Sequence, residues 1–200
     1  MVLGIAVKMI HSYKISGLSV QTGDILCMAF DGEDVVNPGD YWRILGLLIP
    51  GEVDHVAVYV GPGGLCVEVS ARGVYTFNME DNEWAPEKMF KHRGLFKDHL
   101  VGAAYPLHGL NLTSDREEHI QLGVAEYCFA QAEVKKPYNL NLFNPEREDA
   151  FYCSQLAYKA YLSQGINLNT GQGVPNLPGT ENIIFPQEIW QGCYHQRVAG

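Results

Sequence analysis

The stretch "DHVAVYVGPGGLCVEVS" (residues 54–70) decides the fold that we expect for this chain. Two valine-rich runs are separated by Gly-Pro-Gly-Gly, a pattern that is typical of a β-hairpin. Two residues do not suit a dry hairpin: His55 at the start of the first strand and Glu68 near the end of the second. A polar side chain buried there either finds a partner or costs free energy.

The Gly-Pro-Gly-Gly turn also predicts the register of the two strands. Pairing outward from it places Val60 opposite Leu65 and Ala57 opposite Glu68. His55 and Glu68 are then diagonal neighbours on one face, about 7–8 Å apart at the backbone. A carboxylate on one imidazole nitrogen would leave the other nitrogen for the proton of a nucleophile. A slip of one residue removes this pairing. The alternative is a histidine bonded to a backbone carbonyl and a glutamate that faces solvent.

Composition and charge limit the class of protein. The chain has 200 residues, of which 46% are hydrophobic and 18% charged, so it can bury a sizeable core. We expect one domain over residues 1–200, with a core at about 22–165 and a wrapping tail at 166–200. The formal net charge is −9, from 23 acidic and 14 basic residues. This excess of acid argues against nonspecific binding to nucleic acid or to an anionic membrane.

The five cysteines are irregularly spaced and form no CxxC pair, so we expect neither a disulfide framework nor a four-ligand zinc site. The short apolar start of the chain is interrupted by Lys8 and His11, with no basic region before it and no small-residue cleavage site. We therefore expect no signal peptide, no stable membrane anchor and a cytoplasmic location. The sequence does not indicate an oligomeric state.

Hydrophobic periodicity predicts an α+β fold, an antiparallel, barrel-like meander packed against separate helices. We expect a helix that begins with a capping box at Ser114 and extends to residue 136, and a second helix at 151–165. The tail is expected to form little regular structure. Strands are predicted at residues 22–30, 55–60, 65–70, 73–79 and 99–107, and a short helix is predicted within 37–52.

Cys153 lies at the start of the predicted helix 151–165. The unpaired backbone N–H groups there carry about half a positive charge, which favours a thiolate. The same groups can bind the oxyanion of a tetrahedral intermediate. A lone cysteine is more often an inert buried residue, so this interpretation requires an imidazole beside it. Cys193 and His195 are a weaker alternative thiol–imidazole pair near the end of the chain.

Several segments together resemble the circularly permuted papain-like amidases. These proteins are relatives of the NlpC-type cell-wall amidases in which the histidine strand precedes the cysteine helix. The resemblance covers most of residues 22–165. It is carried by "GDILCMAF", "DHVAVYVG", "CVEVS", "KPYNL" and "FYCSQLAYKAY".

The resemblance implies Cys153 as the nucleophile, His55 as the base and Glu68 as the residue that orients the base. It also places Tyr138 of "KPYNL" near the substrate. Gln155 stands where members of the family more often carry an acidic residue. The implied activity is hydrolysis of an amide bond in a peptide or peptide-like small substrate through a thioester, without metal or cofactor.

The sequence leaves three functions open: an amidase, a lipid acyltransferase and a binding module. Glu52 and Asp54 beside His55 suggest a lysine-bearing substrate, although charged residues at the rim of a site are often merely solvated. A lipid acyltransferase of the lecithin–retinol acyltransferase-like type would need an apolar approach to Cys153, which residues 41–51 would supply. A binding module on the same fold would show no turnover.

Overall fold

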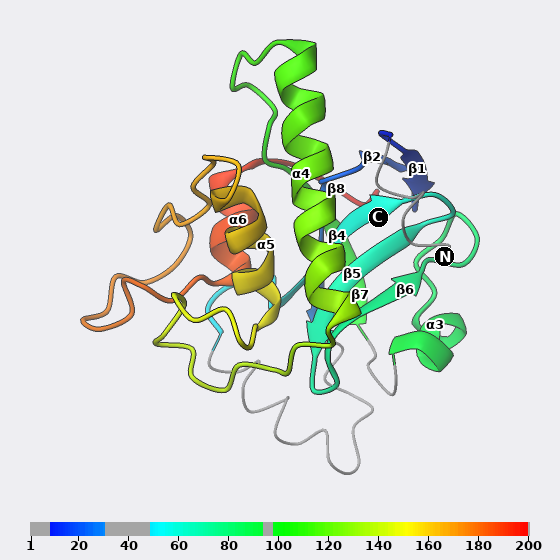
Figure 1. The fold of residues 1–200 in the computed structure, drawn as a ribbon. Helices are drawn as coiled ribbons and strands as arrows, with labels where there is room; N and C mark the ends of the chain where they lie inside the picture. The colour runs from blue at the N-terminus through cyan, green and yellow to red at the C-terminus, as the bar shows by residue number, and fades with distance from the viewer. Residues whose placement is uncertain (1–8, 31–48, 94–97, 200) are drawn as a thin grey trace.

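The computed structural model of the protein describes residues 9–30, 49–93 and 98–199, shown in colour in Figure 1. Over these ranges the chain is α+β, with an antiparallel sheet packed against a few helices, as predicted. The helix predicted within 37–52 falls mostly outside the described residues.

Six strands form the main sheet in the order β6-β5-β4-β3-β7-β8, and each strand is antiparallel to its neighbours. The sheet is open, so the predicted barrel-like closure is wrong. Closure would require β6 to pair with β8, but these strands lie at opposite ends of the sheet. The strands are β3 (Ile25–Phe30), β4 (His55–Gly61), β5 (Leu65–Ser70), β6 (Gly73–Asn78), β7 (Asp98–Tyr105) and β8 (Tyr194–Arg197).

The β4–β5 hairpin has the predicted register around its two polar residues, His55 and Glu68. Ala57 is opposite Glu68, as the turn predicted. The predicted partner of Leu65 is wrong, because the register shifts after Tyr59 and Leu65 pairs with Gly61. This irregularity is a β-bulge, which adds one residue to a strand close to the turn. The bulge lies between the turn and Ala57, so the pairing farther along the strands is unaffected.

Two glycines make the tight hairpin turn possible. Gly63 and Gly64 both have positive φ, 65° and 73°, a region that L-residues with a side chain rarely adopt. A Cβ atom on Gly64 would also lie 2.9 Å from the Cβ of Met79. The turn that sets the register therefore depends on glycine at these positions.

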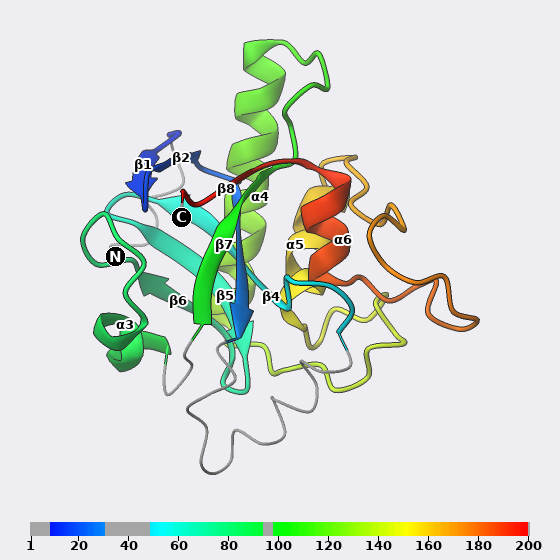
Figure 2. The ribbon, with the colours of Figure 1, turned by 180° about the vertical axis from the view of Figure 1, so that it is seen from behind.

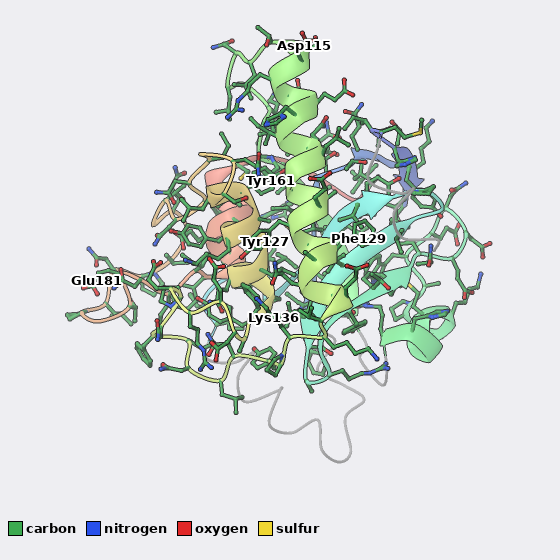
Figure 3. The ribbon with its side chains drawn as sticks, in the orientation of Figure 1. Asp115, Tyr127, Phe129, Lys136, Tyr161 and Glu181 are labelled. Carbon is green, nitrogen blue, oxygen red and sulfur yellow. The ribbon has the colours of Figure 1, made fainter. Side chains whose placement is uncertain are left out.

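Two helices cover one face of the sheet, α4 (Ser114–Glu133) and α5 (Cys153–Leu162). Tyr127 and Phe129 leave α4 on different sides, toward α5 and toward the strands (Figure 3). The helix is capped by Thr113, whose hydroxyl accepts the N–H of Arg116, and not by Ser114 as predicted. The buried valines on the covered face of the hairpin are Val56, Val58, Val60, Val67 and Val69.

The opposite face is covered by elements that the sequence did not predict (Figure 2). A hairpin of β1 (Ser12–Ile15) and β2 (Leu18–Gln21) and the helix α3 (Pro86–Arg93) pack there. The two strands have four residues each, too few for a clear alternation, and Met89 is the buried apolar residue that the described side chains of α3 contribute. Periodicity therefore gave no signal for these elements.

The tail forms little regular structure, as predicted, but two short elements lie near its end. After an outer loop marked by Glu181 (Figure 3), the chain forms α6 (Pro186–Gly192) and then β8, which pairs with β7. The residues of β8 are polar and mostly exposed, so no alternation indicated a strand. The strand forms because the edge of β7 offers unpaired backbone groups. Gly102 permits the close pairing, since a Cβ there would lie 2.1 Å from the carbonyl oxygen of Gln196.

Within residues 9–30, 49–93 and 98–199, no helix combines the length and the apolar character needed to span a bilayer.

Replacing Trp190 tests the structural role of the tail. Trp190 in α6 is fully buried, and its indole N–H donates to Glu52 (3.1 Å). We expect Trp190→Ala to lower the free energy of unfolding by about 3–5 kcal/mol in urea denaturation, because truncating a buried tryptophan leaves a cavity. Leu177→Ala, at an exposed position in the same tail, should change it by no more than about 0.5 kcal/mol. Equal effects of the two substitutions would contradict this role.

Candidate active site

Cys153 is the first residue of α5, as the sequence predicted. Tyr152 before it is extended (φ −102°, ψ 168°), so the chain enters the helix directly from an extended segment. The Cys153 side chain therefore lies at the end of the helix where backbone N–H groups lack partners within the helix. The residue is nevertheless buried, with a relative exposure of 9%.

Gln155 organises the loop in front of Cys153. Its Nε2 donates to the carbonyl oxygens of Pro145 (3.0 Å) and Arg147 (2.8 Å), while its Oε1 accepts from Nδ2 of Asn139 (3.0 Å). An ionised acidic side chain at this position would have no donor for the two carbonyl groups. The Gln155 amide therefore links the loop before α5 to the first turn of the helix.

His55 connects the hairpin to the helix. Its Nε2 lies 2.9 Å from Oε2 of Glu68, so the predicted pair is formed. The imidazole also makes a side-chain hydrogen bond with Cys153. Because Nε2 faces the carboxylate, Nδ1 is the nitrogen left for the sulfur. The structure therefore brings Cys153, His55 and Glu68 together in one row, although Cys153 is far from the other two in sequence.

The contacts with Cys153 and Glu68 favour the protonated form of His55. Burial by itself lowers the pKa of the imidazole, but the charge of the Cys153 sulfur, the hydrogen bond to it and the contact with Glu68 act in the other direction. Together they raise the pKa of His55 to about 10. The site is thus arranged as an imidazolium between two groups that can carry negative charge, which is the charge pattern of a thiolate–imidazolium pair.

Glu68 is almost fully buried and is held by a bidentate pair that the sequence did not reveal. Nε and Nη2 of Arg93 each donate to its carboxylate, both at 2.8 Å. The hydroxyl of Tyr75 donates to the same carboxylate. Burial would raise the pKa of Glu68, but the guanidinium of Arg93 and the bond to His55 hold it well below its usual range. Glu68 is therefore a carboxylate at any ordinary pH.

Arg93 is itself buried and has a second carboxylate partner. Its Nη1 and Nη2 donate to the two oxygens of Asp98, each at 2.8 Å. The indole N–H of Trp84 also donates to Asp98 (3.2 Å). The guanidinium of Arg93 lies over the rings of Phe77 and Trp84, about 5 Å from each ring centroid. Arg93 and Asp98 gave no sequence signal, because charged residues in short polar segments usually face solvent.

A small cavity of about 70 Å³ opens beside Cys153. Cys153 and Tyr138, the residue that the resemblance implied to lie near the substrate, both line this cavity. Tyr138 is held there by a parallel bridge between its backbone and that of Phe151. The other lining residues are Ile49, Leu142, Tyr152, Ser154, Ile183, Ile184, Phe185 and Pro186.

The two acidic residues beside His55 already have partners within the protein. Glu52 accepts hydrogen bonds from the indole N–H of Trp190 and from the guanidinium of Arg197. Asp54 accepts the backbone N–H of Phe30 (3.0 Å). These contacts give the two carboxylates structural roles, and neither residue lines the cavity at Cys153.

The other four cysteines differ from Cys153 in their surroundings. Burial raises the pKa of Cys193 to about 12 and holds those of Cys27, Cys66 and Cys128 well above the usual range. The ring nitrogen of His195 bonds with the backbone carbonyl of Cys193 at 3.0 Å. That contact uses the Cys193 backbone, so it does not support the alternative thiol–imidazole pair.

Comparison with known proteins adds nothing to this geometry. Searches against protein-family models, curated proteins and solved structures found no match. Among the residues that the structure describes, no three His, Cys, Asp or Glu side chains gather as a metal site would require. Any function must therefore be argued from the row of Cys153, His55 and Glu68 and from the cavity beside it.

Replacing Arg93 by methionine tests whether it compensates the buried charge of Glu68. We expect a loss of about 3–5 kcal/mol in unfolding free energy at pH 7, because a buried carboxylate loses its cation. Because the pKa of Glu68 is lowered in the folded protein, its ionised form stabilises the fold at pH values above 4.5, the ordinary pKa of a glutamate. This stabilisation is lost as the pH falls below that value. The difference between the two proteins should therefore shrink toward pH 4. Lys88→Met, at an exposed position of the same helix, should leave the unfolding free energy almost unchanged. A pH-independent loss would contradict the charge argument.

A titration of His55 tests its contact with Cys153. In protein with isotope-labelled histidine, NMR should show that the His55 ring keeps its proton up to about pH 10. In Cys153→Ala the ring should lose its proton at a clearly lower pH, because the charge and the hydrogen bond of the sulfur are gone. Cys193→Ala serves as the control and should leave this titration unchanged. Identical titrations in the wild type and Cys153→Ala would show that the two groups do not interact.

Proposed function

We propose that this protein is a permuted papain-like cysteine hydrolase that cleaves an amide bond in a peptide or peptide-like substrate. One observation carries the proposal: His55 contacts both Cys153 and Glu68, which is the order of a nucleophile, a base and an orienting carboxylate. The position of Cys153 as the first residue of α5 adds a ready set of backbone N–H donors.

In the proposed reaction, the thiolate of Cys153 attacks the carbonyl carbon of the amide, and backbone N–H groups at the start of α5 bind the oxyanion. The tetrahedral intermediate collapses, the C–N bond breaks, and the imidazolium of His55 gives its proton to the leaving amine. The acyl group is then a thioester on Cys153. Neutral His55 takes a proton from water, hydroxide adds to the thioester, and the acid and the thiolate are released.

Glu68 and Arg93 have supporting roles in this proposal. Glu68 accepts the Nε2–H of His55 and so directs Nδ1 toward the sulfur. Arg93 holds Glu68 ionised and in place through two hydrogen bonds. Arg93 is therefore a positioning residue, because it acts on the base only through Glu68. None of the steps requires a metal or a cofactor.

The cavity at Cys153 favours a second candidate function. Its walls are mostly aliphatic and aromatic, which also suits acyl transfer from a lipid, as in the lecithin–retinol acyltransferase-like proteins. Of the apolar stretch 41–51, Ile49 lies in the cavity wall. A thioester formed from a phospholipid, without turnover of any peptide amide, would support this candidate.

Two measurements on one set of variants test the proposed activity. Iodoacetamide at pH 6 should alkylate Cys153 at least tenfold faster than the other four cysteines, because His55 stabilises its thiolate. A screen of small peptide amides, including lysine-bearing ones, should give turnover that is lost in Cys153→Ala and His55→Ala. In Glu68→Gln the rate should fall, because the imidazole is no longer oriented by a carboxylate.

Cys193→Ala is the matched control, since it removes a partly exposed cysteine outside the row. It should keep both the alkylation rate of Cys153 and the turnover. Equal alkylation of all five cysteines would show that Cys153 is not an activated thiol and would contradict the proposed hydrolase. Rapid alkylation of Cys153 without turnover of any amide or lipid ester would instead point to a binding module.

A further inference from the structure

The cavity beside Cys153 is bounded by parts of the chain that are distant in sequence. Tyr138 and Leu142 come from the loop before α5, Tyr152 and Cys153 from the start of the helix, and Ile183 and Phe185 from the tail. The tail therefore contributes a wall of the candidate site and is more than an external wrap.

Hydrogen bonds fix the tail to the first turn of α5. The hydroxyl of Tyr152 accepts the backbone N–H of Ile184 (3.1 Å), and the hydroxyl of Ser154 donates to the carbonyl of the same residue (2.7 Å). Tyr152, Ser154 and Ile184 are all buried. Because these bonds lie on either side of Cys153 in the sequence, the wall from the tail is held at a set position relative to the sulfur.

The reaction chemistry indicates which part of a substrate would lie in this cavity. In the proposed mechanism the amine leaves, whereas the acyl group stays bonded to Cys153 until water releases it. Cys153 is one of the residues that line the cavity, so the group bonded to it in the covalent intermediate, the acyl group, would lie next to this cavity. We propose that this cavity is the acyl subsite and that it selects substrates with a short aliphatic acyl group.

This inference rests on the proposed function, and the size of the cavity sharpens it. An apolar cavity of about 150 Å³ can bind benzene. The cavity here is about 70 Å³, so it suits a short alkyl chain and not an aromatic ring. Its described lining residues carry no charge, and Glu52 and Asp54 are bonded elsewhere. A cationic acyl side chain would thus be buried without a counter-ion, at a cost in free energy.

The test uses p-nitrophenyl esters, which share one leaving group and differ in the acyl group: acetate, propionate, butyrate, benzoate and 4-(trimethylammonio)butyrate. Acylation of Cys153 in the full-length protein is followed by intact-protein mass spectrometry. Each rate constant is divided by that of N-acetylcysteine with the same ester, which removes the intrinsic reactivity of the ester. The normalised rate should rise about fourfold per methylene from acetate to butyrate. The benzoate and the cationic ester should react at least tenfold more slowly than butyrate.

Leu142→Phe fills part of the cavity and should move the normalised butyrate-to-acetate ratio toward one. Leu140→Phe is its matched control, because Leu140 lies on the same loop but is exposed and does not line the cavity. It should keep the wild-type ratio. The ratio is measured within one protein, so it does not depend on the fraction of that protein that is folded.

The outcomes separate a failure of this inference from a failure of the proposed function. Acylation of Cys153 at a rate that does not depend on the length of the acyl chain, or that is highest for the cationic ester, would contradict the proposed acyl subsite. It would not contradict the proposed thiol hydrolase. Alkylation by iodoacetamide without acylation by any ester would also overturn the subsite. If Cys153 reacts with neither esters nor iodoacetamide faster than the other cysteines do, both proposals fail.

Discussion

The burial of a negative charge at Glu68 is the constraint on which the rest of this site depends. An uncompensated carboxylate at 1% exposure would cost several kcal/mol, so the fold must supply positive charge and hydrogen-bond donors. Arg93 supplies two donors and Tyr75 a third, while Asp98 compensates Arg93 in turn. Two carboxylates against one guanidinium leave one negative charge, which favours a proton on His55.

Distant elements of the chain meet at this charge cluster, at one end of β4. The helix α3 brings Arg93, the start of β7 brings Asp98 and the hairpin brings Glu68. The helix α5 brings Cys153 to His55. The tail adds a further contact, because Gln187 of α6 accepts the backbone N–H groups of Glu52 and Val53, just before His55. The position of the imidazole is thus set from several directions.

Features that depend on local sequence were predicted correctly. The turn glycines fixed the pairing of Ala57 with Glu68, and the apolar pattern after Cys153 placed the start of α5. The sequence also suggested that Glu68 and His55 face each other, which the structure confirms. The predictions of a barrel-like closure and of a cap at Ser114 failed. Closure depends on which strands lie nearby in space, and periodicity does not report that. The cap was misplaced by one residue, because Thr113 and Ser114 are both residue types that cap helices.

The amino-acid sequence by itself determined the α+β class, the hairpin register around Glu68 and the candidate residues Cys153 and His55, because turn geometry and helical periodicity act over a few residues. The tertiary structure alone decided that Arg93 neutralises the buried carboxylate of Glu68 and that the tail forms one wall of the cavity at Cys153. These are contacts between segments separated by tens of residues. They form only once the hydrophobic faces of the sheet have been covered, and no local pattern encodes them.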